Sequence, residues 1–235
     1  MQSFYDYFTK EVLEANYPSS FSIDVFKELP SFKQRVDYAN KTLKRISSGS
    51  SRIVYEVDEK TVLKIAKNQK GIAQNELEIE MSNDYYLNSI GLMAEIYEKD
   101  EGKFLWLEME KAGKLTDRKF KQLTGQSFET LNSFIYYFFK QYSRRPIYFR
   151  GMAEEEAERL VNPNELFPET NYGAEFFGKV KEYISNYQPD ISTVQDMTQM
   201  STWGIVKRNG KEEVVIVDYG VNEEIINKYY RKHRG

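Results

Sequence analysis

The sequence predicts an α+β fold in two parts, a strand-rich first part with one inserted helix and a mostly helical second part that ends on a β-hairpin. Three observations predict it. Apolar and polar residues alternate in short runs between about residues 45 and 112, around one helical interval. Helical spacing then dominates from residue 116 to about residue 188. Finally, Asn209-Gly210 separates two short apolar runs, which is a strong hairpin signal.

The chain divides into three segments on this basis. Residues 1–44 are expected to form a helical extension, residues 45–112 the strand-rich part, and residues 113–235 the reduced helical part. The expected elements after the extension are a hairpin over 53–66, a helix over 71–87, a hairpin over 94–109, a helical stretch, a hairpin over 203–217, and a short helix of three or four turns from about residue 222.

Composition excludes several classes of function. The net charge of −3 predicts no attraction for nucleic acids or anionic membranes. The absence of cysteine and the single histidine, His233, exclude thiolate chemistry, Cys/His zinc sites and a serine–histidine triad. Any metal ion would therefore have oxygen ligands, which favours Mg²⁺ or Mn²⁺. The longest apolar runs, 134–139 and 214–217, are too short to span a bilayer.

Small residues precede the first hairpin. In the stretch Ser47-Ser48-Gly49-Ser50-Ser51, backbone N–H groups could approach phosphate oxygens without a side-chain clash. The alternative is an ordinary serine-rich turn. Lys64, in the next strand, shares a face with Val62 and Ala66 and so should point at an apolar surface or a cleft. Its alternative is an edge-strand lysine that prevents aggregation.

Acidic residues follow at three places. The helix after Lys64 offers Glu76, Glu78 and Glu80 as partners, of which Glu76 and Glu80 share a face. Asp218 ends a buried strand and precedes Gly220, which suits a hard cation, although a turn-forming Asp is the alternative. Asp196, expected on a loop, could accept a proton from an attacking hydroxyl.

The order of these features resembles that of the protein-kinase-like superfamily, over roughly residues 45–112 and 174–221. Ser47-x-Gly49-x-x-Arg52-x-Val54 is similar to the Gly-x-Gly-x-x-Gly-x-Val loop, with only the middle glycine kept. The resemblance implies a two-lobed fold with ATP, and Mg²⁺ or Mn²⁺, held between the lobes. Gly49, Ser50 and Val54 would then lie over the phosphates.

The resemblance also implies a role for each charged residue. Lys64, in a match to Val-Ala-Ile-Lys, would reach the α- and β-phosphates, with Glu80 or Glu76 as its helix partner. The stretch 107–110, with Glu108 and Glu110, resembles the hinge whose backbone binds adenine. Asp218-Tyr219-Gly220 is similar to Asp-Phe-Gly, which places Asp218 on the metal ion.

The catalytic region departs from the family pattern. Asp196 falls where the His-Arg-Asp aspartate would be, but Val194 and Gln195 replace the His and Arg. The expected asparagine ligand is replaced by Ser201, or by Thr202 with one residue inserted. Fifteen residues follow Gly220, so we expect no activation segment and no large substrate-docking region.

The sequence therefore predicts an ATP-dependent phosphotransferase that acts on a hydroxyl of a protein or a small molecule. A pseudokinase that binds nucleotide or a protein partner is the main alternative, and transfer of AMP is the third. The resemblance is to compact kinase-like proteins, including those of bacteria and their phages, so a cytoplasmic location in a bacterium or a phage-infected host is expected.

Overall fold

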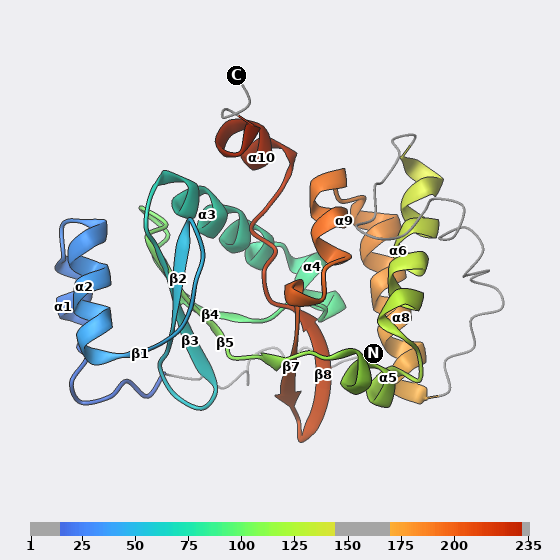
Figure 1. Cartoon of the computed structure of the whole chain (residues 1–235), viewed down its shortest axis with the longest axis horizontal. Helices are drawn as coiled ribbons and strands as arrows, with labels where there is room; N and C mark the ends of the chain where they lie inside the picture. The colour runs from blue at the N-terminus through green and yellow to red at the C-terminus, as the bar shows by residue number, and fades with distance from the viewer. Residues whose placement is uncertain (1–14, 144–169, 232–235) are drawn as a thin grey trace.

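The computed structural model describes residues 15–143 and 170–231 and has two lobes (Figure 1). The expected helices of residues 1–14 lie outside the described residues. The first lobe contains α1 (Ile23–Glu28), α2 (Phe32–Thr42), β1 (Lys44–Ser48), β2 (Arg52–Glu56), β3 (Thr61–Ala66), α3 (Gln69–Asn83), α4 (Tyr85–Ile90), β4 (Ile96–Lys99) and β5 (Trp106–Glu110). The second lobe contains β6 (Gly113–Lys114), α5 (Asp117–Thr124), α6 (Phe128–Tyr142), α8 (Asn171–Glu182), the π-helical turn η1 (Tyr183–Tyr187), α9 (Ile191–Met197), the 3₁₀ turn η2 (Met200–Thr202), β7 (Trp203–Arg208), β8 (Lys211–Ile216) and α10 (Glu223–Tyr229).

The first lobe is built on a five-stranded antiparallel sheet with the order β1-β2-β3-β5-β4. Both hairpins expected there are present, β2–β3 and β4–β5. The small residues 47–48, expected to be loop, extend strand β1 beside β2. The helix expected over residues 71–87 is two helices, because Asp84 is extended and its side chain caps α4 by accepting from the amide of Leu87.

The two faces of this sheet are covered by different parts of the chain. α1 and α2 pack on the outer face, at the left of Figure 1, around Phe26, Tyr55 and Leu63. The inner face, which carries Val62 and Leu107, belongs to a core that continues into the second lobe. The inner face is therefore the one that faces the second lobe.

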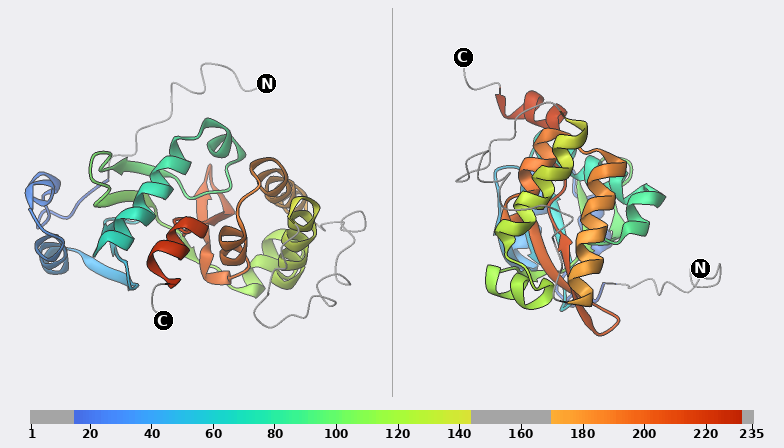
Figure 2. Two further views of the ribbon diagram at one scale, coloured as in Figure 1. Left: turned by 90° about the horizontal axis from the view of Figure 1, so that it is seen from above. Right: turned by 90° about the vertical axis from the view of Figure 1, so that its right-hand side faces the viewer.

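The second lobe combines helices with a short sheet of order β6-β7-β8. The hairpin β7–β8 is confirmed, and Asn209 and Gly210 both have positive φ, 50° and 78°, as a tight hairpin turn requires. Helix α10 spans only seven residues, shorter than expected. In the left view of Figure 2, α10 lies beside the first-lobe helix α3, which α10 contacts.

Backbone bonds join the lobes close to the end of β8. The amide of Ala94 donates to the carbonyl of Ile216 at 2.9 Å, and the amide of Ile216 donates to Leu92 at 2.8 Å. These bonds fix residues 217–220, which follow β8, beside the first lobe. Among the helices described here, none has both the length and the apolar character needed to cross a membrane.

Candidate functional site

Lys64 lies at the centre of the first-lobe sheet. β3 runs between β2 and β5, so Lys64 is not an edge-strand lysine, and the residues opposite it are Val54 and Leu107. Its side chain is 6% exposed, and its ammonium group donates to both carboxylate oxygens of Glu78, at 3.2 and 3.1 Å. It also donates to the carbonyl of Val217 in the second lobe, at 2.7 Å. The lysine therefore links the sheet, the helix and the second lobe.

The helix partner of Lys64 is Glu78, which corrects the expected Glu76 or Glu80. The buried face of α3 runs through Gly71, Gln74, Asn75 and Glu78, at spacings of three and four residues. Glu78 is fully buried on that face, Glu76 is half-buried, and Glu80 is exposed. The prediction of Glu76 or Glu80 was wrong because these two residues share a face of α3 that does not pack on the sheet. The neighbouring face, which carries Glu78, packs there.

Arg52, the first residue of β2, joins the same charged group. One Nη contacts Glu78 at 3.0 Å and lies 3.4 Å from the side-chain oxygen of Asn75, and the other contacts Asp218 at 2.5 Å. Arg52 is 7% exposed, whereas the side chain of Asp218 is 55% exposed. Arg52 was not predicted as a site residue, although it puts a large charged side chain where the loop pattern has its third glycine.

Two cations and two carboxylates thus share one cluster, formed by Arg52, Lys64, Glu78 and Asp218, which we call the charge cluster. Burial lowers the pKa of Lys64, and the attraction of Glu78 opposes that effect. Because buried charges are costly unless they are paired, the two cations depend on Glu78. The cluster carries no net formal charge.

The serine-rich loop lies against the start of α3. Gly49 accepts a bond from the ammonium group of Lys67 at 2.6 Å, and Ser50 accepts one from Asn68 at 3.0 Å. A Cβ on Gly71 would lie 2.3 Å from the carbonyl oxygen of Ser51, so only glycine permits this contact. The expected contact of Gly49 and Ser50 with phosphates stays a prediction.

Asp218 and Gly220 sit where the chain passes from β8 to α10. The hydroxyl of Tyr219 donates to the carbonyl of Ala94 at 3.2 Å, which anchors the Asp-Tyr-Gly stretch to the first lobe. A Cβ on Gly220 would lie 2.6 Å from the carbonyl of Gln74, so the glycine allows the chain to cross α3 closely. This anchoring holds Asp218 within the charge cluster, in contact with Arg52.

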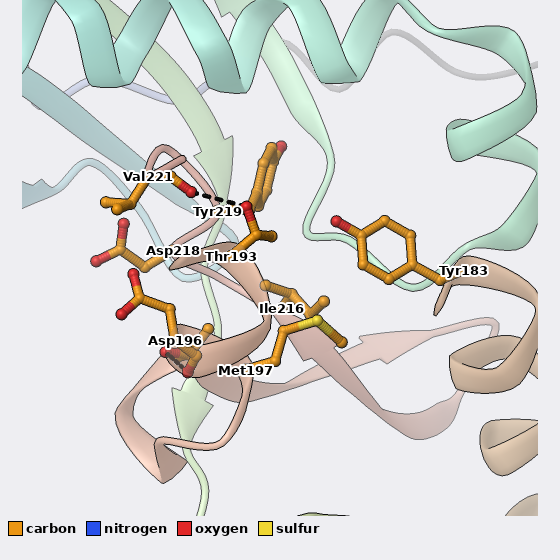
Figure 3. A pocket seen from close by; sticks show the side chains of 9 residues that line it. Tyr183, Thr193, Asp196, Met197, Ile216, Asp218, Tyr219 and Val221 are labelled. Carbon is orange, nitrogen blue, oxygen red and sulfur yellow. Dashed lines mark hydrogen bonds between the residues drawn. The ribbon is translucent and has the colours of Figure 1, made fainter. Parts of the chain in front are cut away.

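Asp196 lies on the last turn of α9 and not on a loop as expected. The side chain of Asp190 caps this helix by accepting a hydrogen bond from the amide of Thr193 at 2.9 Å. Val194 and Met197 form the buried face of the helix. Asp196 and Asp218 line the same pocket, with their carboxylates on its left side in Figure 3. Burial, and then repulsion by Asp218, raise the pKa of Asp196 from 3.8 to about 6.

The residues expected to hold a metal ion have protein partners in this structure, and their metal-binding role stays a prediction. Arg52 already occupies an oxygen of Asp218, and the Thr202 hydroxyl donates to the carbonyl of Asp196 at 2.7 Å. Ser201 is exposed and lies outside the pocket lining. Across the described ranges, no three side chains of Asp, Glu, His or Cys are placed to bind a metal ion.

The two hinge glutamates have partners away from the charge cluster. Glu108 lies inside the sheet, opposite Leu63 and Glu98, and its side chain accepts a bond from the hydroxyl of Tyr17. Glu110 binds Arg208 at 2.6 Å. The backbone of this strand is paired on both sides, with β3 and with β4, and the nucleotide contact expected of this stretch stays a prediction.

The five-stranded sheet, the strand lysine paired with a helix glutamate and the facing Asp-Tyr-Gly give this chain a protein-kinase-like fold. The α+β class with a helical second lobe is confirmed. Asn75 was not predicted from the sequence, and Glu78 was named only beside Glu76 and Glu80. The signal that could have found them is the run of polar residues at 74, 75 and 78, spaced as one helix face.

Comparison with known proteins gives structural likeness only. No family model matches the sequence, and no curated protein does. Similar solved structures include the complex of APH(2″)-IIa with streptomycin and ATP, at 15% identity and a TM-score of 0.35 over 82% of this chain and 71% of that one. The ADP-bound aminoglycoside phosphotransferase APH(2″)-Ib is 16% identical, with a TM-score of 0.37 over 80% and 69%. The gentamicin complex of APH(2″)-IIa is 14% identical, with a TM-score of 0.35 over 80% and 69%.

Proposed function

We propose that the protein is an ATP-dependent phosphotransferase that moves the γ-phosphoryl group to a hydroxyl of a protein or a small molecule. The observation that carries the proposal is the pairing of Lys64 with Glu78 in the same cluster as Asp218, with Asp196 lining the same pocket as Asp218. A lysine fixed by a buried carboxylate keeps its charge at a defined position, which is what phosphate recognition needs.

Each of these residues has a separate role in the proposed reaction. Lys64 holds the α- and β-phosphates, and the backbone of residues 49–51 lies over them. The acceptor oxygen attacks the γ-phosphorus while the bond from phosphorus to the β–γ bridging oxygen breaks, and ADP leaves. Asp196 accepts the proton of the acceptor hydroxyl. Its raised pKa suits a group that both takes and returns a proton near neutral pH.

A second function is favoured by a specific observation. Arg52 holds Asp218, and Ser201 and Thr202 stand where an asparagine would be expected. Both features suit a pseudokinase, in which the cleft binds a nucleotide or stays closed and the protein acts by binding a partner. Transfer of AMP would use the same side chains and is the third candidate.

Labelled ATP separates the three candidates. The purified protein is incubated with γ-labelled or α-labelled ATP and Mg²⁺ or Mn²⁺, with and without cell lysate as a source of acceptors. Label from the γ position alone supports phosphotransfer, and label from the α position supports AMP transfer. Binding without transfer supports the pseudokinase. Asp196→Asn should lower the rate of transfer by about 100-fold or more, and Asp24→Asn, at an exposed residue of α1, is the matched control.

A further inference from the structure

We infer that Arg52 is a built-in cation that competes with a divalent metal ion for Asp218, so that metal binding requires its guanidinium group to leave that carboxylate. The inference rests on the proposed function only in taking Asp218 as the carboxylate that would bind metal. The observation behind it is that the position beside Asp218 already has a positive charge.

Arg52 and Asp218 come from different lobes, and their contact joins the two lobes. Arg52 begins β2 in the first lobe, and Asp218 follows β8 in the second. The 2.5 Å contact between one Nη and an Asp218 oxygen is a charge-assisted bond. A glycine at position 52, as in the loop pattern that this stretch resembles, could not make it.

Charge balance determines what the cluster can accept. With Arg52 and Lys64 opposite Glu78 and Asp218, the formal charges sum to zero. A divalent cation added to Asp218 while Arg52 stayed would put two positive centres on one carboxylate in a partly buried site, where like charges repel strongly. The metal ion and the guanidinium group are therefore alternatives.

Arg52 has another carboxylate partner when it leaves Asp218. Its other Nη is held by Glu78 at 3.0 Å, so the guanidinium group keeps one ion pair. Asp218 has a side chain that is 55% exposed and can take a ligand from solvent. The exchange thus needs movement of one side chain, without unfolding of the loop.

Direct titration with Mn²⁺ alone tests the inference without any activity assay. Calorimetry is carried out on the wild-type protein, Arg52→Gln, Asp218→Asn and Arg45→Gln, an exposed arginine of β1 that serves as the matched control. Arg52→Gln should bind Mn²⁺ about 10-fold more tightly than wild type, which corresponds to about 1.4 kcal/mol. Arg45→Gln should match wild type, and Asp218→Asn should lose the site.

The outcomes separate this inference from the proposed function. Equal Mn²⁺ affinity of wild type and Arg52→Gln, or weaker binding by Arg52→Gln, overturns the competition, and a wild-type protein that still transfers phosphate keeps its proposed function. Tighter Mn²⁺ binding by Arg52→Gln without phosphate transfer in any variant supports the competition and contradicts the proposed function. If Arg52→Gln fails to fold by circular dichroism, Arg52→Lys replaces it, because an ammonium group cannot bridge both carboxylates and should also tighten Mn²⁺ binding. Unchanged affinity in Arg52→Lys would then overturn the inference.

Discussion

Two buried glutamates lie on opposite sides of the first-lobe sheet and have different surroundings. Glu78 is completely buried against the inner face, where Lys64 and Arg52 both contact it. Glu108 is 2% exposed on the outer face, where its bond comes from the hydroxyl of Tyr17. Burial raises the pKa of Glu108. The two glutamates are buried to a similar degree but have different partners. On the inner face Glu78 pairs with two cations, and on the outer face Glu108 accepts a hydrogen bond from a neutral hydroxyl.

The largest expected effect comes from removing the charge of Glu78. Glu78→Gln leaves Lys64 without a carboxylate partner and Arg52 with Asp218 alone, and should lower the free energy of unfolding by about 3–5 kcal/mol. Glu108→Gln, the matched control, keeps an acceptor for Tyr17 and should change it by about 1 kcal/mol or less. Urea unfolding of both variants measures the difference. Equal losses of unfolding free energy in the two variants would contradict the claim that Glu78 compensates buried cations and Glu108 does not.

Asp196 gives the next effect, on turnover. Asp196→Asn should keep nucleotide binding but lower turnover by about 100-fold or more, since the variant cannot accept the hydroxyl proton. In the wild-type protein, activity should rise with pH through about 6, the pKa of Asp196, because the carboxylate must be ionised to act as a base. A pH profile of kcat checks both points. Full activity of a folded Asp196→Asn variant would contradict the phosphotransferase mechanism.

The same carboxylate should also affect stability. Its folded-state pKa of about 6 lies above its ordinary value of 3.8, so the folded protein holds the proton more tightly than the unfolded chain. The contribution of Asp196 to stability is complete below pH 3.8 and is lost as pH rises through 6. Relative to wild type, Asp196→Asn should therefore gain about 1–2 kcal/mol between pH 4 and pH 7, with allowance for solvent screening. Urea unfolding at the two pH values tests it, and a constant difference would contradict the raised pKa.

The smallest effect is expected on the outer face. Tyr17→Phe removes the hydroxyl bonded to Glu108 but keeps the ring, which stacks on Phe21 with centroids 4.7 Å apart. A loss of about 1 kcal/mol in unfolding free energy is expected. Nucleotide affinity, measured by calorimetry, should not change. Weakened nucleotide binding would show that the outer face is coupled to the cleft.

Much of the fold could be predicted from the sequence because its signals are local. The alternation around Lys64 and the Asn209-Gly210 turn each depend on a few neighbouring residues, and both hold in the structure. The charge cluster depends on contacts between residues distant in the sequence, such as Arg52 with Asp218. Spacing along α3 could not tell which face of the helix packs on the sheet, so Glu78 could not be chosen over Glu76 and Glu80 from the sequence.

The central claim is that Lys64, held by Glu78, recognises the phosphates of a nucleotide. Calorimetric titration with ATP and Mg²⁺ of wild type, Lys64→Ala and Lys60→Ala tests it most directly, since Lys60 is an exposed lysine of the β2–β3 turn. Lys64→Ala should stay folded, because Glu78 keeps Arg52 as a partner, and should weaken ATP binding by about 10-fold or more. Lys60→Ala should bind as wild type does. Equal ATP affinity in all three proteins, or no binding in any of them, would contradict the account.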